Sequence, residues 1–174
     1  MMKKLRKKTG FSLGETMVAL LIISLITMSI ATAVAFGARQ YGNSVSRSEA
    51  RILCSSLSSI IQDELRNTTQ VMIDGDDLYY RTTNYESGDD LSRFDQDEDG
   101  HIVVMTGTEK FLLLGEAAYS GEDDLTAELE SISFDDGVFN VSLVVHTSNG
   151  GGEIRSDFTV IPLNTVKELD PETI

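Results

Sequence analysis

The chain has 174 residues, of which 14 are Lys or Arg and 28 are Asp or Glu, so its formal net charge is −14. This length favours one domain of ordinary size, and an apolar content of 41% excludes wholesale disorder. The acidic balance argues against a nucleic-acid partner, because phosphate contacts need an excess of basic side chains. A single cysteine, Cys54, excludes an intramolecular disulfide.

Charge is distributed unevenly along the chain. Five of the 14 basic residues lie in the first eight positions, and without residues 1–10 the chain carries 9 basic and 28 acidic residues, a net charge of −19. Residues 16–38 form an uncharged, mostly apolar run between Glu15 and Arg39. About 20 such residues cross a bilayer as a helix. By the positive-inside rule, the N-terminus is then cytoplasmic and everything after Arg39 lies outside.

Three kinds of N-terminal segment share this pattern. A secretory signal peptide also has a basic start, and small-residue triplets at 31–33 and 33–35 offer cleavage sites, but its apolar run is usually shorter. A plain signal anchor accounts for the length. It gives no reason for the carboxylate of Glu15 at the edge of the run, where burial is costly.

The third kind is indicated by residues 7–15, KKTGFSLGE, which resemble the processing site of type IV prepilins and pseudopilins. In that family a short basic leader ends in Gly, and a membrane aspartyl peptidase cuts after it. The peptidase commonly methylates the new N-terminal residue, usually Phe, and a Glu follows four residues later. The resemblance places the cut between Gly10 and Phe11. It assigns Glu15 to assembly, through pairing with the N-terminal amine of a neighbouring subunit. Gly14 departs from the family, which usually has a branched apolar residue there.

The resemblance also implies a location and partners. It divides the N-terminal part into a leader, residues 1–10, and a transmembrane assembly helix, residues 11–38. The protein would lie in the cytoplasmic membrane as a single-pass protein and then in an extracellular filament of a type IV pilus, competence or type II secretion-like system. The implied partners are the prepilin peptidase, other pilin or pseudopilin subunits, the inner-membrane assembly platform and membrane lipid.

Residues 39–67 continue as an amphipathic helix, because apolar residues recur there at spacings of three and four and no proline interrupts them. Gly37 and Gly42 predict a kink or local fraying near the junction with the apolar run. Cys54 lies on or beside the apolar stripe, and we interpret it as a buried structural thiol.

After the helix the pattern changes to short alternating apolar runs separated by Gly and Asp, which predicts a strand-rich domain over 68–163 and a tail over 164–174. The last three runs should form an antiparallel meander, because turn signals at 135–137 and 149–152 separate them. The predicted strands are Val71–Ile73, Leu78–Arg81, Ile102–Met105, Phe111–Leu114, Leu125–Phe134, Val138–His146 and Ile154–Leu163. One face of such a sheet needs a cover, and the amphipathic helix can supply it. The expected fold is therefore α+β and pilin-like, a long N-terminal helix packed on an antiparallel sheet.

One acidic segment carries a candidate metal site. Residues 95–100, DQDEDG, match the first half of a calcium loop, in which Asp95, Asp97 and Asp99 would converge on one hard cation. The twelfth position is Thr106 instead of the bidentate Glu of an EF-hand. Two interpretations stay open, a Ca²⁺ site and a solvated acidic hairpin turn. No other cofactor is indicated.

Two functions follow from these patterns. The first is a non-enzymatic filament subunit, a minor pilin or pseudopilin, processed after Gly10 and assembled through its N-terminal helix. The alternative is a secreted or membrane-anchored acidic surface module that binds calcium or a surface ligand. An enzyme is not expected, because the sequence has no nucleophile–base pair, CxxC, Gly-rich phosphate loop or HExxH.

Overall fold

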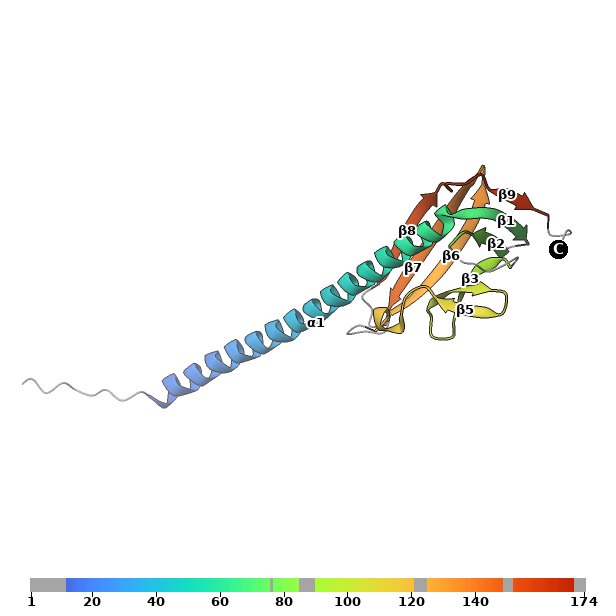
Figure 1. The fold of residues 1–174 in the computed structure, drawn as a ribbon. Helices are drawn as coiled ribbons and strands as arrows, with labels where there is room; N and C mark the ends of the chain where they lie inside the picture. The colour runs from blue at the N-terminus through green and yellow to red at the C-terminus, as the bar shows by residue number, and fades with distance from the viewer. Residues whose placement is uncertain (1–11, 76, 85–89, 121–124, 149–151, 171–174) are drawn as a thin grey trace, which may run out of the picture. The chain divides into compact units, whose positions relative to one another are not determined.

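A computed structural model describes residues 12–75, 77–84, 90–120, 125–148 and 152–170, and these fall into two compact units that divide between Tyr41 and Gly42. One long helix, α1 (Leu13–Arg66), contributes residues to both units (Figure 1). All strands belong to the second unit. They are β1 (Thr68–Asp74), β2 (Asp77–Thr82), β3 (Ser92–Gln96), β4 (Ile102–Thr106), β5 (Glu109–Leu112), β6 (Leu125–Asp135), β7 (Val138–Thr147), β8 (Glu153–Val160) and β9 (Lys167–Leu169), with a short 3₁₀ helix, η1 (Glu116–Ala118), before β6.

The helical assignment of α1 continues without interruption through Gly37 and Gly42, so the expected fraying is not found. The helix ends at Arg66, where its last carbonyls need partners from outside the helix. The side-chain amide of Asn67 donates to the Asp63 carbonyl at 3.0 Å, and the Leu163 N–H donates to the Arg66 carbonyl at 2.8 Å. These bonds satisfy two carbonyls at the C-terminus of α1, directly before the first strand begins.

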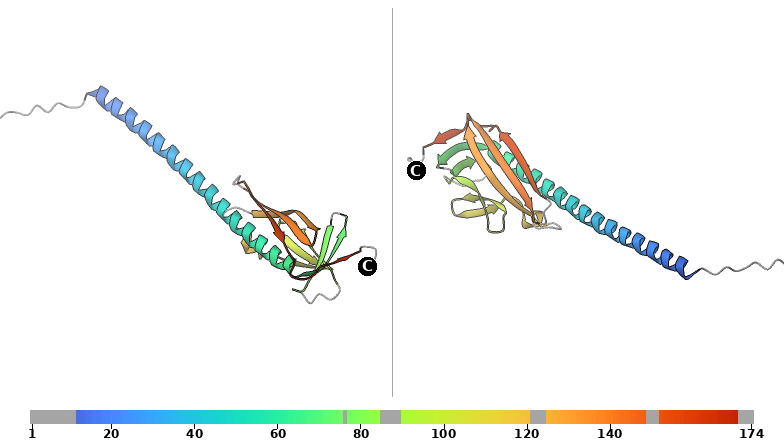
Figure 2. Two further views of the ribbon diagram at one scale, coloured as in Figure 1. Left: turned by 90° about the horizontal axis from the view of Figure 1, so that it is seen from above. Right: turned by 180° about the vertical axis from the view of Figure 1, so that it is seen from behind.

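The strands form two sheets. The larger has the order β5-β4-β3-β2-β1-β9, and its pairs are antiparallel apart from β1 with β9, which is parallel. The smaller is the antiparallel meander β6-β7-β8, as predicted from the turn signals (Figure 2). Asp136 and Gly137 make the two-residue turn between β6 and β7 with φ of +49° and +80°, the pattern of a type I′ hairpin turn.

A register shift in β6 was not predicted. Leu129 pairs with Leu143 and Ser131 pairs with Ser142, so Glu130 is an extra residue opposite β7. The bulge changes which positions face inward. Leu125 is buried before the shift and Phe134 after it, although simple alternation would place an odd and an even position on opposite faces.

The core of the second unit lies between the C-terminal part of α1 and the sheets. Within this part of the helix, Leu53 and Leu57 belong to a buried cluster that includes Leu143 and Val145 of β7. Toward the helix end, Ile61 and Leu65 belong to a second cluster with Val71, Tyr80 and Phe139. The expected α+β fold, with a long N-terminal helix on a mainly antiparallel sheet, is therefore confirmed.

Cys54 lies in the first of these clusters and is 3% exposed, which confirms its interpretation as a buried thiol. Burial raises the pKa of the Cys54 thiol, and a hydrogen bond with Ser58 only partly offsets this effect. A thiol held in its neutral form inside a core is a poor nucleophile.

Two strands lie where the sequence pattern gave no strand. β3 contains one large apolar residue, Phe94, and its full ladder with β4 runs from Ser92–Thr106 to Gln96–Ile102. β9 falls inside the segment expected to be a tail, and it pairs with β1 in parallel from Gln70–Lys167 to Met72–Leu169. Both strands are short, so their own sequence carries little alternation, and pairing with a neighbouring strand stabilises them.

A pair of substitutions on α1 tests the packing of the helix on the sheets. We expect Leu57→Ala, at a position with 0% exposure, to lower the free energy of unfolding by about 2–5 kcal/mol, because it leaves a cavity. Ile52→Ala is the control, since Ile52 is 64% exposed and its loss should change stability by about 0.5 kcal/mol or less. Thermal unfolding of the full chain in detergent micelles would measure both, and equal effects would contradict the packing described here.

Candidate functional site

The described residues of the first unit expose a continuous apolar helical surface. Every residue from Ser12 to Tyr41 is exposed within the structure, including large side chains such as Leu20 at 66% and Phe36 at 64%. By length and composition, α1 could cross a membrane. Burying a large apolar side chain is favourable by about 1.5–3 kcal/mol relative to leaving it exposed to water. The segment has many such side chains. It therefore needs lipid or protein around it.

The Ser and Thr side chains of the uncharged segment 16–38 are satisfied by the helix itself. The hydroxyls of Thr16 and Ser24 donate to carbonyls three residues earlier, and those of Thr27, Ser29 and Thr32 donate to carbonyls four residues earlier. An unsatisfied hydroxyl in hydrocarbon is costly. These bonds within the helix make the segment compatible with a membrane despite its five hydroxyl groups.

Glu15 has a local role at the start of α1. The Ser12 N–H donates to Glu15 Oε2 at 2.9 Å, and the Glu15 N–H donates to Ser12 Oγ at 3.3 Å. This reciprocal pair is a capping box, which satisfies two of the backbone donors that a helix N-terminus leaves free. This capping role was not predicted, although the S-x-x-E spacing of Ser12 and Glu15 is its sequence signal. Gly10 and Phe11, the predicted processing site, lie outside the described residues.

The acidic segment forms the turn between β3 and β4, and Asp97 organises it. Asp97 Oδ1 accepts the N–H groups of Asp99 at 3.1 Å and His101 at 2.7 Å. Asp97 Oδ2 lies 3.2 Å from His101 Nδ1 and 3.3 Å from Lys110 Nζ. The Asp97 side chain is only 9% exposed. Bonds of this kind are how an Asp side chain stabilises a tight turn.

Gly100 is required in this turn for a reason that involves no cation. Its φ is +80°, and a Cβ there would lie 2.7 Å from Thr126 Cγ2. The Gly100 carbonyl also accepts the Ala127 N–H at 2.9 Å. The turn therefore packs directly against the start of β6, and only glycine permits this close approach.

The three predicted calcium ligands do not lie together. Donor atoms of Asp97, Asp99 and His101 lie within 4.8 Å of one another, and Asp95 is not part of this group. Asp95 instead accepts the Gln96 N–H at 2.8 Å and a hydrogen bond from Arg93 Nη2 at 3.1 Å. A cation at the cluster would compete with the Lys110 ammonium for Asp97 Oδ2. The arrangement suits a hairpin turn closed by an ion pair.

Electrostatics in the turn keep Asp97 ionised. Burial by itself would raise the pKa of Asp97, but the hydrogen bonds from the His101 N–H and from Lys110, with the charge and hydrogen bond of the His101 ring, outweigh it. The pKa of Asp97 is therefore below its usual value. The His101 ring also packs on Tyr119 with centroids 4.2 Å apart, and the Ile102 N–H donates to the Tyr119 hydroxyl at 3.1 Å.

No protein-family profile, no characterised protein and no solved structure matches this chain.

The lowered pKa of Asp97 predicts a specific acid sensitivity. A carboxyl group whose pKa is lower in the folded state contributes stability above its unfolded-state pKa, about 3.9, and loses it as the pH falls through the folded-state value. We expect Asp97→Asn to melt a few degrees below the unmodified chain at pH 7. The difference should shrink as the pH falls below about 4.

Asp99→Asn is the matched control, because only the backbone N–H of Asp99 bonds to Asp97. Melting curves of the full chain between pH 7 and pH 3 would measure the effect. A constant difference across this range would contradict the assigned role of the charge.

Proposed function

We propose that this chain is a structural subunit of a type IV pilus-like filament, a minor pilin or pseudopilin, processed between Gly10 and Phe11 and assembled through α1. The observation that carries the proposal is the fully exposed apolar stretch from Ser12 to Tyr41, placed directly after a prepilin-like processing sequence. In this account lipid covers that surface first, and neighbouring subunits cover it in the filament.

The charge distribution supports assembly through the apolar part of α1 and not through the strand-rich unit. Residues 42–174 contain 8 basic and 27 acidic residues, a formal charge of −19. Neighbouring copies of such a unit repel one another when they are close. Cohesion between subunits must then come from the apolar part of α1, whose segment 16–38 carries no charge.

Glu15 supplies the register between packed helices. Its Oε2 is bonded to the Ser12 N–H, and Oε1 has no partner among the described residues. After cleavage, the amine of Phe11 on a neighbouring subunit could bind to this second oxygen. A buried unpaired charge costs several kcal/mol, and pairing offsets that cost for both groups. Apolar helix faces alone would slide past one another, and the ion pair fixes one axial position.

The proposal includes a location and partners. The basic residues before Gly10 keep the N-terminus cytoplasmic, which places the strand-rich unit outside the cytoplasmic membrane. The partners are the prepilin peptidase, other pilin or pseudopilin subunits, an assembly platform in the inner membrane and membrane lipid. The competing function is an acidic surface module that remains anchored or is secreted, and it requires no cut after Gly10.

The mature N-terminus tests the proposal first. We expect the mass of the protein recovered from membranes to match a chain that begins at Phe11, with or without one added methyl group, because the peptidase removes only the ten-residue leader. Gly10→Val should block this cut and leave the full-length mass. Intact mass spectrometry distinguishes the outcomes. A mature chain that begins at Met1 or after the apolar stretch, at Phe36, would favour the surface module.

Substitutions at Glu15 separate its two roles. Glu15→Gln keeps an oxygen that accepts the Ser12 N–H but removes the charge, whereas Glu15→Ala removes both. Loss of capping costs about 0.5–2 kcal/mol of helix stability, and this cost should not block insertion. If the charge sets the register, both variants should be cut normally but incorporated into filaments at least tenfold less than the unmodified chain.

Ser12→Ala is the control for capping, because it removes the bond from the Glu15 N–H and keeps the carboxylate. We expect it to assemble close to normally. Sheared filaments quantified against membrane-bound protein would give the ratio for each variant. Normal incorporation of Glu15→Gln would show that capping, and not charge pairing, is the role of this residue.

A further inference from the structure

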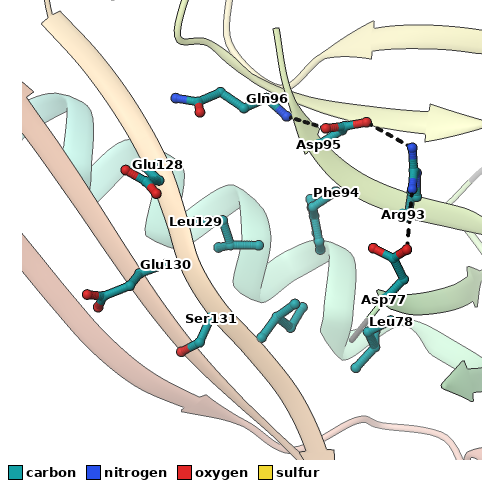
Figure 3. Close-up of a pocket in the computed structure, with 11 residues that line it drawn as sticks. Asp77, Leu78, Arg93, Phe94, Asp95, Gln96, Glu128, Leu129, Glu130 and Ser131 are labelled. Atoms are coloured by element: carbon teal, nitrogen blue, oxygen red, sulfur yellow. Dashed lines mark hydrogen bonds and ion pairs between the residues drawn. The ribbon is translucent and has the colours of Figure 1, made fainter. Parts of the chain in front are cut away.

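The two sheets of the second unit enclose a groove where their strands are not paired to each other. The groove has a volume of about 460 Å³ and is lined from one side by β2 and β3 and from the other by β6 (Figure 3). The β2–β3 ladder consists of a single pair, Tyr80 with Ser92, so β3 has no ladder partner on that side from Arg93 onward. The groove is therefore bounded by strand edges.

The outer edge of β6 is bonded at one end of the groove and open along the rest. The Ala127 N–H donates to the Gly100 carbonyl, and the Ala127 carbonyl accepts a hydrogen bond from Gln96 Nε2 at 2.7 Å. Both groups thus point away from β7. Because backbone groups alternate along an antiparallel strand, those of Leu129 point the same way. Neither the N–H nor the carbonyl of Leu129 has a hydrogen-bond partner outside the ladder in the described part of the chain.

Side chains along the two walls follow the same alternation. Leu129 of β6 and Phe94 of β3 both project into the space between the two walls (Figure 3) and are only partly buried. Glu128 on β6 and Asp95 on β3 are exposed beside them. Leu78 and Ile132 extend the apolar lining. A strand placed between these walls would therefore meet apolar side chains on its inner face and carboxylates on its outer face.

Charges around the groove favour a cationic guest. Four carboxylates line it, those of Asp77, Asp95, Glu128 and Glu130, against the single guanidinium of Arg93. Arg93 already lies 3.8 Å from Asp77 and 3.1 Å from Asp95, so it neutralises part of one wall only. On the other wall, Arg155 and Ser142 bind Glu130 and lower its pKa, so this carboxylate is already paired. Glu128 Oε2 lies 3.9 Å from His146 Nε2, and Glu128 is the lining carboxylate without a Lys or Arg partner among the described residues.

From these features we infer that the groove binds an extended cationic segment of a partner protein, which adds as a strand to the outer edge of β6 with basic residues facing outward and apolar residues facing inward. The backbone of the guest would bond to the free groups of Leu129. Its basic side chains would lie next to Glu128 and Asp95, where opposite charges on neighbouring strands stabilise pairing. A second copy of this strand-rich unit is a poor guest because it carries the same net charge of −19. The inference does not depend on the proposed filament role.

A blocked hexapeptide of alternating lysine and valine is the probe, tested on the full chain in neutral detergent micelles by fluorescence anisotropy. We expect saturable binding below about 1 mM and slower amide hydrogen exchange at Leu129 in the complex. The double variant Asp95→Asn with Glu128→Gln should weaken binding about tenfold at low salt, since each lost ion pair contributes modestly. The matched control, Glu116→Gln with Asp135→Asn, removes two exposed carboxylates outside the groove and should leave binding unchanged.

Two further probes separate strand addition from simple charge attraction. The same peptide with alternate backbone nitrogens methylated keeps its charges but loses the hydrogen bonds of one edge, and spermine carries charge without a backbone. Both should bind at least tenfold more weakly than the hexapeptide. Leu129→Pro removes the free N–H, and a folded variant should lose the same binding. Equal binding of the three ligands, no binding of the hexapeptide, or no protection of Leu129 would overturn the inference.

Discussion

The apolar helical surface from Ser12 to Tyr41 has to be buried by lipid or by other protein chains. Among the described residues, every side chain of that segment is exposed. Farther along the same helix, the apolar stripe that contains Leu57 and Ile61 is fully buried against the sheets of the second unit. One helix therefore has an apolar part that the chain covers itself and an apolar part that it leaves for lipid or other subunits. The proposed filament role is the function that uses this second surface.

In the apolar stretch, at the start of α1 and in the β3–β4 turn, many polar groups bond to partners close in sequence. The hydroxyls of the apolar stretch bond to carbonyls one turn earlier, Ser12 and Glu15 cap the helix reciprocally, and Asp97 closes its own turn. Local satisfaction matters most in a segment that could cross a membrane, because no water replaces a missing partner in hydrocarbon. Under the proposed filament role, an amine from a neighbouring subunit would bind Glu15 through its second oxygen, and the cap would remain.

The long helix and the β6-β7-β8 meander could be predicted from the sequence, because helical periodicity, strand alternation and the turn at Asp136 and Gly137 are all local signals. β3 and β9 could not, since each is short and depends on pairing with a neighbouring strand. The register shift at Glu130 could not be predicted from the sequence either, because a bulge depends on the geometry of two strands. Around Asp97 the motif left a Ca²⁺ site and an acidic hairpin turn open, and the described hydrogen bonds are those of a tight turn between β3 and β4. The structure adds Lys110 from β5, thirteen residues away in sequence, which no local pattern could place beside Asp97.

Solvent access to the apolar segment tests the central claim most directly. A cysteine introduced by Ile26→Cys in a Cys54→Ala background reports on the middle of the segment, and Ser148→Cys, at an exposed position, reports on the folded unit. We expect a charged, membrane-impermeant maleimide to label the second cysteine but not the first, both in membranes and in sheared filaments. Labelling at position 26 in either preparation, or recovery of a monomer from the medium that has lost this segment, would contradict it.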